Sequence, residues 1–344
     1  MTWTEKIAPD ETERFERYAQ ELRAIQKALA PDKAQRPQWR ALHTKAHTAA
    51  VGELRVAAPA ELRAGVFAVD RTWPVYLRFS NGSPGKSSDK RPDIRGIGLK
   101  LVGVPGKKLI PPLADAVTQD FLLIQTDVAG VRDPDEFLTL VRLSRKGQAL
   151  LLPRLIGALG FRRAFAIARG FLKMPKVRSY ATSPFFTAVP LQIGGEAVKL
   201  ALMPKLDGAG AGAAGAATSG PSALRDDLVD RLAKGPMTWT LMAQRFVDEA
   251  TTPIEDASVR WPVEKSPWVA LGELVVPAQD VTGARGQEIE GLVESLSFDP
   301  WHALPDHRPL GSMMRARAPA YRESVLERGA APEPTSVLAP APPK

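Results

Sequence analysis

The first thirty residues carry apolar side chains on one face of a helix. The apolar positions recur at spacings of three and four residues, the period of an amphipathic helix: Phe15, Tyr18, Leu22, Ile25 and Leu29. A Pro-Asp pair follows the last of them and ends the pattern. We therefore expect an amino-terminal helix within residues 1–30.

From Val51 onward, apolar and polar residues alternate as they do in half-buried strands. Turn-rich residues separate several of these runs, and few helical patterns lie between the early ones. This arrangement favours an antiparallel sheet or barrel over a parallel sheet with alternating helices. The predicted strands are residues 52–58, 74–80, 96–103, 120–126, 197–204, 238–247 and 268–277.

Three further regions have helical patterns: residues 142–178, 222–235 and 287–296. In the second region, Ser222 is expected to cap the start of the helix and Gly235 to end it.

Two segments have the composition of chain without regular structure. Residues 207–221 form a Gly- and Ala-rich run that we expect to be a flexible loop. This run matches G-x-G-x-x-G, but it is of low complexity, and no second strand with an acidic residue follows about twenty residues later, so we reject a dinucleotide site. Residues 329–344 are rich in Pro and Ala and are expected to be disordered.

The net charge of +8 is concentrated in one segment. Residues 142–178 contain ten Lys and Arg and no Asp or Glu, so the rest of the chain carries −2, the difference between +8 and +10. This local basicity, without a recognition motif, excludes nucleic acid as a partner. The basic helices either pack on the sheet with their charges in solvent, lie on an anionic membrane or attract acyl carboxylates, and the first arrangement is the commonest.

The cysteine and histidine contents limit the chemistry. There is no cysteine, and the four histidines are His43, His47, His302 and His307. The amino terminus lacks the apolar run of a secretory signal and no run of eighteen apolar residues occurs, so we expect a cytoplasmic protein, with membrane association through 142–178 left open. A transition metal held by protein ligands alone would be unusual here, whereas haem iron needs only one protein ligand and tyrosine is among those used.

The run "RARAPAY" at residues 315–321 offers such a ligand. In a helix, Arg317 lies one turn before Tyr321 and can donate a hydrogen bond to its oxygen. A neighbouring guanidinium stabilises a phenolate, whose pKa is otherwise about 10. Most such pairs in proteins are ordinary surface or stacking pairs, so the spacing alone leaves the question open.

Six segments in one order resemble haem catalases, from about Arg40 to Tyr321. They are "RALHTK" (40–45), the stretch from "VYLRFS" to "GLKL" (75–101), "VRDPDEF" (131–137), "WPVEKSPWVALGELVV" (261–276), "ESLSFDP" (294–300) and "RARAPAY" (315–321). The resemblance implies an α+β fold, an antiparallel eight-stranded catalase-like β-barrel with surrounding helices, which agrees with the strand pattern. Residues 1–328 would then form a single catalase-like haem domain, with 142–178 as a basic helical insertion.

The resemblance also implies roles on both sides of a haem b group. Tyr321 would ligate the iron with Arg317 beside it, and His43 would be the distal residue that moves a proton between the peroxide oxygens. His47, four residues on, is the open alternative to His43. The other implied haem contacts are Arg40 and Arg78 at the propionates, Ser80 near the distal histidine and Phe137 on the distal side.

The chain also departs from the family pattern. Gln125 is the only amide available where the family has a distal asparagine, so it is the expected orienting residue, and it is one methylene longer. This extra methylene is expected to hold peroxide less well. Ala129 and Gly130 stand where the family has two phenylalanines, so we also expect a roomier distal side. Pro319 is expected to bend the helical turn before Tyr321.

The expected function is that of a haem-dependent peroxidase or catalase-like oxidoreductase. Its substrate would be hydrogen peroxide or an organic hydroperoxide, its intermediate an oxo-ferryl species, and its second partner an unidentified electron donor. The alternatives are a fatty-acid hydroperoxide isomerase or dehydratase, and a non-enzymatic haem-binding protein at a membrane surface. Whether the chain forms a homo-oligomer stays open.

Overall fold

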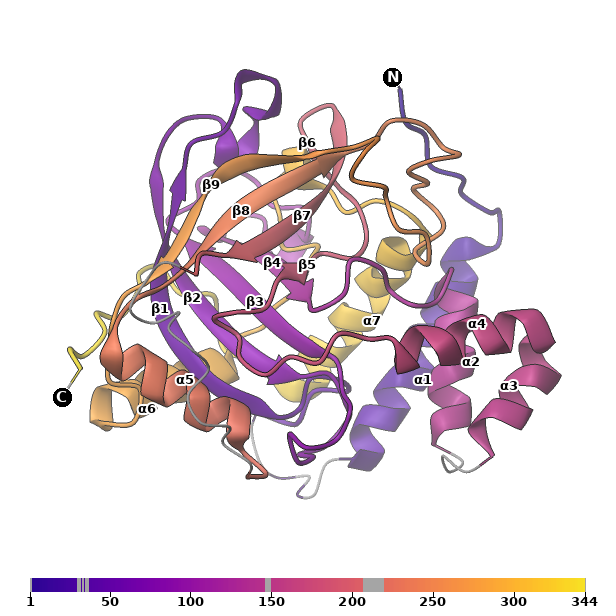
Figure 1. Cartoon of the computed structure of the whole chain (residues 1–344), viewed down its shortest axis with the longest axis horizontal. Helices are drawn as coiled ribbons and strands as arrows, with labels where there is room; N and C mark the ends of the chain where they lie inside the picture. The colour runs from indigo at the N-terminus through magenta and orange to yellow at the C-terminus, as the bar shows by residue number, and fades with distance from the viewer. Residues whose placement is uncertain are drawn as a thin grey trace.

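Eight antiparallel strands close into a barrel. The computed structural model describes residues 2–29, 32, 34, 37–145, 150–206 and 220–343. The strand order is β5-β4-β3-β2-β1-β9-β8-β7-β6, and β5 also pairs with β7, which closes the ring and leaves β6 beside β7 (Figure 1). The strands are β1 (Ala46–Val56), β2 (Thr72–Asn81), β3 (Arg95–Val102), β4 (Thr118–Ile124), β5 (Phe185–Phe186), β6 (Leu191–Ile193), β7 (Glu196–Pro204), β8 (Met237–Arg245) and β9 (Trp268–Val276).

The predicted α+β class and eight-stranded barrel are therefore confirmed. All seven predicted strands exist within a few residues of their expected bounds. The strands that the sequence did not predict are β5 and β6, which have only two and three residues and so show no alternation.

Both faces of the barrel wall are buried near β2 and β3. Leu77 and Phe79 on β2 and Leu99 on β3 belong to the hydrophobic core inside the barrel. Their sequence neighbours point to the outer face, because successive side chains of a strand alternate. Arg78 and Gly98 therefore face the helices outside, and every residue of β3 is buried.

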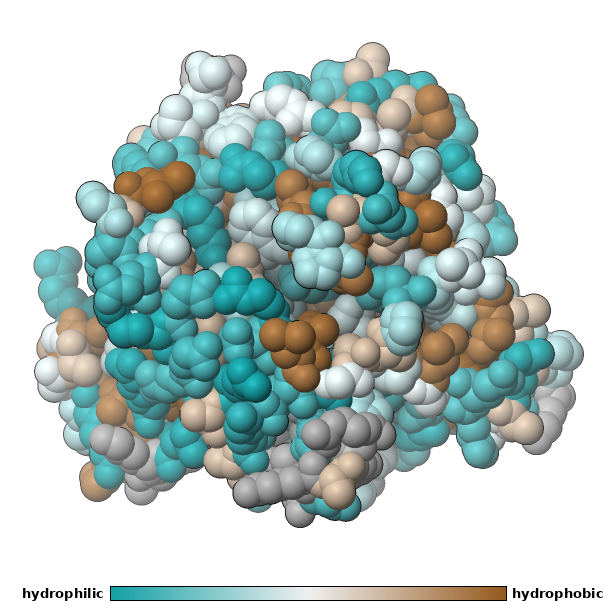
Figure 2. Space-filling view, turned by 180° about the vertical axis from the view of Figure 1, so that it is seen from behind, coloured by the Kyte–Doolittle hydropathy of each residue, from teal (hydrophilic) through white to brown (hydrophobic). Residues whose placement is uncertain are grey.

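Seven helices surround the barrel within the described residues. They are α1 (Glu11–Leu29), α2 (Pro134–Ser144), α3 (Leu151–Leu159), α4 (Phe161–Leu172), α5 (Ala223–Lys234), α6 (Ala284–Ser295) and α7 (Ser312–Arg328). Short 3₁₀ helices lie at Ala60–Leu62, Gly65–Phe67, Pro111–Leu113 and Pro305–His307. The helices α1 and α7 pack together beside the barrel, whereas α3 and α4 lie at the edge of the molecule, away from the barrel (Figure 1). The face of the molecule that lies behind the view of Figure 1 is mostly hydrophilic, with hydrophobic residues in small separate groups (Figure 2).

The helix predictions hold with three differences. The sequence did not predict α2, which has an N-terminal signal in Asp133, whose side chain accepts a hydrogen bond from the Glu136 backbone N–H at 2.9 Å. The side chain of Ser222 makes no capping hydrogen bond at the start of α5. The helix α4 ends at Leu172, short of the predicted residue 178. Pro319 lies inside α7, and the bend expected there stays a prediction.

The carboxy-terminal segment 329–343 differs from the disorder expected of it. Val337 and Leu338 pack against a buried cluster of β1, β2 and α6, and the Leu338 backbone N–H donates to the Tyr76 hydroxyl at 2.8 Å. Glu333 binds buried side chains beneath this segment, so specific contacts override its composition. The predicted loop 207–221 lies outside the described residues except for its last two. Among the described helices, none combines the length and apolar character needed to cross a bilayer.

Candidate active site

A cavity of about 1280 Å³ lies between the outer face of the barrel and the surrounding helices. Its walls come from β2, β3 and β4, from the segment before β1, and from the helices α1, α2, α3, α4 and α7. The cavity contains every residue that the sequence singled out as a site candidate: Arg40, His43, Arg78, Ser80, Gln125, Phe137, Arg317 and Tyr321. Residues that are spread along the sequence from Arg40 to Tyr321 thus meet in one cavity.

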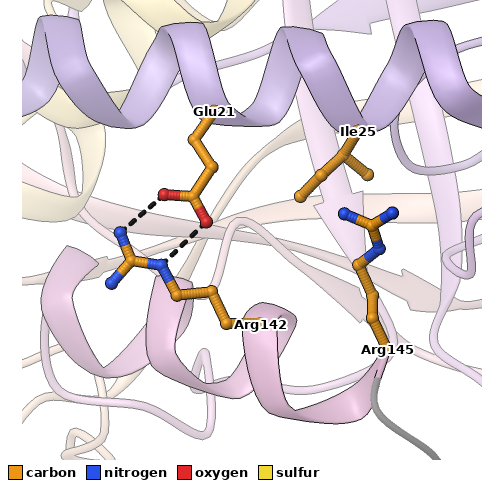
Figure 3. A pocket seen from close by; sticks show the side chains of 4 residues that line it. All are labelled: Glu21, Ile25, Arg142 and Arg145. Atoms are coloured by element: carbon orange, nitrogen blue, oxygen red, sulfur yellow. Dashed lines mark hydrogen bonds and ion pairs between the residues drawn. The ribbon is translucent and has the colours of Figure 1, made fainter.

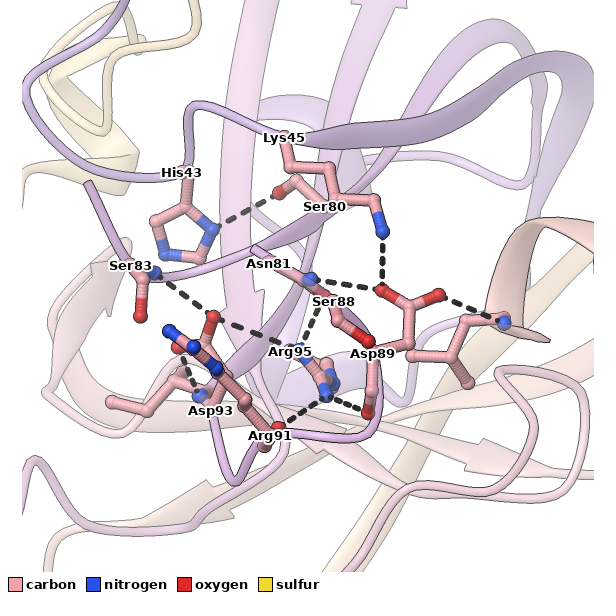
Figure 4. Close-up of polar contacts among 12 residues, drawn as sticks. His43, Lys45, Ser80, Asn81, Ser83, Ser88, Asp89, Arg91, Asp93 and Arg95 are labelled. Atoms are coloured by element: carbon pink, nitrogen blue, oxygen red, sulfur yellow. Dashed lines mark hydrogen bonds and ion pairs between the residues drawn. The ribbon is translucent and has the colours of Figure 1, made fainter. Parts of the chain in front are cut away.

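His43 is held in the cavity wall by its backbone and its ring (Figure 4). Its φ of 55° is in the left-handed region, which is uncommon for a residue other than glycine. The backbone N–H donates to the Gly82 carbonyl at 2.9 Å, and the His43 carbonyl accepts from Arg78 Nη2 at 2.9 Å. Nδ1 lies 3.0 Å from Ser80 Oγ, which leaves Nε2 as the ring nitrogen available to a ligand.

Gly96 on β3 provides the space for the His43 ring. A Cβ atom at position 96 would lie 2.7 Å from His43 Cε1, closer than real Cβ contacts allow. In the same way, a Cβ at Gly98 would lie 2.8 Å from Phe298 Cδ1. Two glycines on the same face of β3 therefore give the cavity a flat floor.

The environment keeps His43 neutral. Burial, together with the positive charges of Arg78, Arg317 and Arg40, lowers the pKa of His43 to about 3. At neutral pH the imidazole is therefore unprotonated and able to accept a proton.

His47, the alternative distal histidine, does not line the cavity. It is fully buried within the barrel wall, where Nε2 lies 2.7 Å from Asn81 Oδ1. Its Nδ1 is 3.6 Å from Asp89 Oδ2. Of the two histidines, only His43 faces the cavity, which agrees with the preferred prediction.

Near His43, the Asp89 carboxylate connects three segments of the chain through hydrogen bonds (Figure 4). Its Oδ1 accepts from Lys45 Nζ at 2.7 Å and from Asn81 Nδ2 at 3.0 Å. Its Oδ2 accepts from the Leu224 backbone N–H at 3.0 Å, at the start of α5. Sequence reasoning missed this carboxylate, because its partners come from three separate parts of the chain.

Three arginines at one end of the cavity gather around Glu294, which supplies a single carboxylate. Arg78 and Arg40 both bind the side chain of Glu294, the latter at 3.3 Å between Nη1 and Oε2. Arg328 Nη2 donates to the Glu294 backbone carbonyl at 2.7 Å. Among the described residues, no other carboxylate pairs with these guanidiniums, so this end of the cavity has an excess of positive charge.

The charges around Glu294 and Arg40 shift the pKa values of both residues. Burial alone would raise the pKa of Glu294, but Arg78 and Arg40 lower it to about 2. Burial lowers the pKa of Arg40 well below its usual value, and the charges of Arg78 and Arg328 act in the same direction. The sequence pointed to Arg40 and Arg78 but missed Arg328, which follows Tyr321 by seven residues and so shares its face of α7.

Arg317 and Tyr321 form the predicted pair on α7. Arg317 Nη2 donates to the Tyr321 hydroxyl oxygen at 2.6 Å, and its guanidinium carbon lies 5.0 Å from the centre of the tyrosine ring. Both residues line the cavity. The i, i+4 spacing therefore places a cation directly on a phenol oxygen inside a cavity, as expected.

Gln125 lies in the cavity wall, but its amide is bound to the backbone. Its Oε1 accepts from the Arg95 backbone N–H at 2.7 Å, and its Nε2 donates to the Pro175 carbonyl at 2.7 Å. These two bonds connect β3 to the chain after α4. The geometry favours a structural role over the predicted orientation of peroxide. Phe137 on α2 and Ala129 line the same cavity, as predicted.

The residues present fit haem b on three counts. The phenol of Tyr321 with its guanidinium partner suits a haem ligand. The buried excess of positive charge suits the two propionates, since guanidinium groups bind carboxylates through paired hydrogen bonds. The glycine floor at Gly96 and Gly98 leaves room for a flat group. Within the described residues, no group of three or more His, Cys, Asp and Glu is placed to hold a bare metal ion.

A second, smaller pocket of about 380 Å³ lies between α1 and α2 (Figure 3). Arg142 Nε donates to Glu21 Oε1 at 2.7 Å across it, and Ile25 and Arg145 complete its lining. An exposed ion pair between two helices accounts for these residues structurally.

Neither a protein-family model nor a curated protein matches the sequence. Solved structures do match in fold. A fungal catalase has a TM-score of 0.67 at 18% identity over 86% of this chain and 60% of its own. A bacterial catalase has a TM-score of 0.62 at 16% identity, over 95% and 63%. Catalase A from Saccharomyces cerevisiae has a TM-score of 0.64 at 16% identity, over 86% and 62%. The chain thus spans about three fifths of the length of these catalases, and it has the catalase-like fold.

Proposed function

We propose that the protein binds haem b in the cavity and is a peroxide-dependent oxidoreductase. The observation that carries the proposal is the meeting, in one cavity, of a phenol bound by a guanidinium, a neutral histidine and a group of arginines that one carboxylate compensates only in part. The catalase-like fold supports the same chemistry. When bound, haem supplies a redox-active iron at which the O–O bond of a peroxide is cleaved.

Tyr321 would supply the iron ligand from α7. Arg317 donates to its oxygen at 2.6 Å, and a guanidinium in this position would stabilise negative charge on that oxygen when it binds iron. At the charged end, Arg40, Arg78 and Arg328 would bind the propionates and fix the orientation of the group.

His43 would transfer the proton. For Nε2 to accept a proton from one peroxide oxygen, Nδ1 must carry a hydrogen and donate it to Ser80 Oγ, 3.0 Å away. The same proton is then returned to the other oxygen, which leaves as water or as an alcohol. The low basicity that burial and the surrounding arginines give His43 favours this return.

Substitution of the histidine tests this role. His43→Gln should keep haem, measured by absorption, and lose peroxide turnover by about 10²- to 10⁴-fold. His47→Gln is the matched control, since His47 lies outside the cavity, and it should keep turnover at equal haem content. If His47→Gln loses turnover and His43→Gln does not, the two assignments are reversed. If neither variant changes turnover, neither His43 nor His47 transfers the proton.

Hydroperoxide isomerisation without net reduction is the second candidate. The small side chain of Ala129 and the exposed apolar residues Phe171 and Leu172 at the cavity edge favour it, because a bulky hydroperoxide has room to enter. The two reactions differ in their balance, since a peroxidase consumes two electrons from a donor for each peroxide and an isomerase consumes none. An isomerised product from an organic hydroperoxide, with no donor oxidised, would select the isomerase. A haem-loaded protein with no turnover of any peroxide would instead be a haem-binding protein without enzymatic activity.

A further inference from the structure

The α3–α4 hairpin presents an apolar stripe to solvent. Phe161, Phe165 and Leu172 are 65%, 54% and 87% exposed, far more than large apolar side chains usually are. They share one face of α4, because four and seven residues separate them. The two phenylalanine rings stack on each other at 6.0 Å between centroids and 14° between planes, which makes one continuous apolar surface.

Cations flank this stripe. Arg162, Arg169 and Lys173 follow one another at spacings of seven and four residues, on the neighbouring face of the helix and just beyond its end. All three are exposed, and none forms an ion pair within the described part of the chain. No acidic residue occurs anywhere in residues 142–178, so nothing local neutralises them.

The hairpin is anchored from behind. Ala164 and Ile167 on the other face of α4 are buried, and Arg163 makes two hydrogen bonds to Glu136 of α2 at 2.7 and 2.6 Å. The helix is thus fixed with its apolar stripe outward, at the edge of the molecule (Figure 1).

The same element forms an edge of the cavity. Phe171 and Leu172 line the cavity and are exposed, and the same is true of four cations: Lys90, Arg91, Lys176 and Arg178. The cavity lining therefore has exposed apolar and cationic side chains, as the hairpin does.

We propose that the α3–α4 hairpin docks the protein on an anionic phospholipid surface, with the adjoining cavity edge facing the lipid. Exposed aromatic and leucine side chains on one helix face, bordered by arginines and lysines, match the interface between acyl chains and anionic headgroups. Docking itself is independent of the proposed function. The consequence that peroxides dissolved in the lipid enter the cavity directly rests on the proposed function.

Vesicle binding of the full chain tests the docking. The protein should cosediment with phosphatidylcholine vesicles containing phosphatidylglycerol, should bind pure phosphatidylcholine much more weakly, and should bind less as salt rises. The double variant Phe161→Ser/Phe165→Ser should bind about tenfold or more weakly, because two apolar side chains no longer enter the membrane. Arg162→Gln/Arg169→Gln should lose about tenfold on anionic vesicles.

Matched controls separate the hairpin from general stickiness. Leu206→Ser removes another leucine that is 63% exposed, and Lys234→Gln/Lys265→Gln removes two exposed cations elsewhere, so both should bind like the parent. Equal binding by the hairpin variants and their controls would overturn the proposal. So would self-association of the parent, seen by sedimentation, that the phenylalanine substitutions abolish without any vesicle binding, because the stripe would then be a contact between copies.

A turnover measurement distinguishes failure of docking from failure of the proposed function. With cumene hydroperoxide held in anionic vesicles, Phe161→Ser/Phe165→Ser should turn over more slowly than the parent, while hydrogen peroxide in buffer should be consumed equally. If the parent turns over neither peroxide, the proposed function is contradicted. Docking is then judged from vesicle binding alone. If the parent and Phe161→Ser/Phe165→Ser turn over each peroxide at equal rates, the claim that the cavity edge faces the lipid is overturned.

Discussion

Two groups of charges lie on the outer face of the barrel, and they are compensated differently. At the cavity, Arg40 and Arg78 bind the one carboxylate of Glu294, and Arg328 binds the backbone carbonyl of the same residue. Beneath the carboxy-terminal segment 329–343, a single buried amine is bound by two carboxylates.

This second group is complete in itself. Lys100 Nζ, fully buried, donates to Asp120 Oδ1 at 2.7 Å and to Glu333 Oε2 at 2.6 Å. Burial raises the pKa of Asp120 to about 8, so it is protonated at neutral pH and the group has no net charge. Thr118 and Ser297 hydroxyls each donate to Glu333 at 2.8 Å. A buried group that balances its own charges can have a purely structural role. An excess of positive charge beside a cavity is instead suited to binding an anionic ligand.

Removal of the amine should have the largest effect. Lys100→Met leaves Glu333 without a counter-ion in a buried site, so the free energy of unfolding should fall by about 3–5 kcal/mol. Urea denaturation measures the change. Lys107→Met is the control, because its pair with Asp115 is exposed, and it should change stability by less than about 1 kcal/mol. Equal effects of the two substitutions would mean that Lys100 is not the centre of the group.

The pH dependence of the same group is the next largest effect. The folded pKa of Asp120 is raised above its unfolded value, so its stabilising contribution is complete at low pH and is lost as pH rises toward about 8. Lys100, Glu333 and the Asp299 backbone N–H are the groups that face it. Relative to Asp120→Asn, which cannot ionise, the parent should lose about 1 kcal/mol of stability for each pH unit between pH 5 and pH 8. A constant difference across that range would show that Asp120 does not ionise as inferred.

At the cavity the corresponding change should spare stability and weaken ligand binding. Arg40→Gln removes one of three cations but leaves Glu294 paired with Arg78. Stability without haem should change by about 1 kcal/mol, and haem should bind about 10- to 100-fold more weakly. Urea denaturation and haemin titration measure the two quantities. A large loss of stability with unchanged haem affinity would make the arginine group structural.

The exposed pair between α1 and α2 should show the smallest effect. Glu21→Gln removes the partner of Arg142, and exposed pairs contribute about 0–1 kcal/mol. Thermal unfolding should shift only slightly and haem affinity should stay the same. A change in haem affinity would connect this pocket to the cavity.

Much of the fold was predictable because alternation of apolar and polar residues survives in strands such as β2 and β8. The strands β5 and β6 were not, since two or three residues carry no period. The carboxy-terminal segment failed for a different reason. Its Pro- and Ala-rich composition indicates disorder, but a single acidic residue, Glu333, reaches a buried lysine 233 positions away.

The site residues were found from motifs, and their surroundings were not. The spacing of Arg317 and Tyr321 fixes their contact within one helix, so the sequence contains it. No feature of the neighbouring sequence indicates that the Gln125 amide forms hydrogen bonds with the backbone of Arg95 and Pro175. The same holds for Asp89, whose partners come from distant segments.

Haem binding by Tyr321 is the central claim, and a haemin titration followed by absorption and resonance Raman spectroscopy tests it most directly. The parent should bind haem with the vibrations of an iron-bound phenolate, and Tyr321→Phe should lose those vibrations together with most of its affinity. Identical spectra and affinities for the parent and Tyr321→Phe would contradict the account.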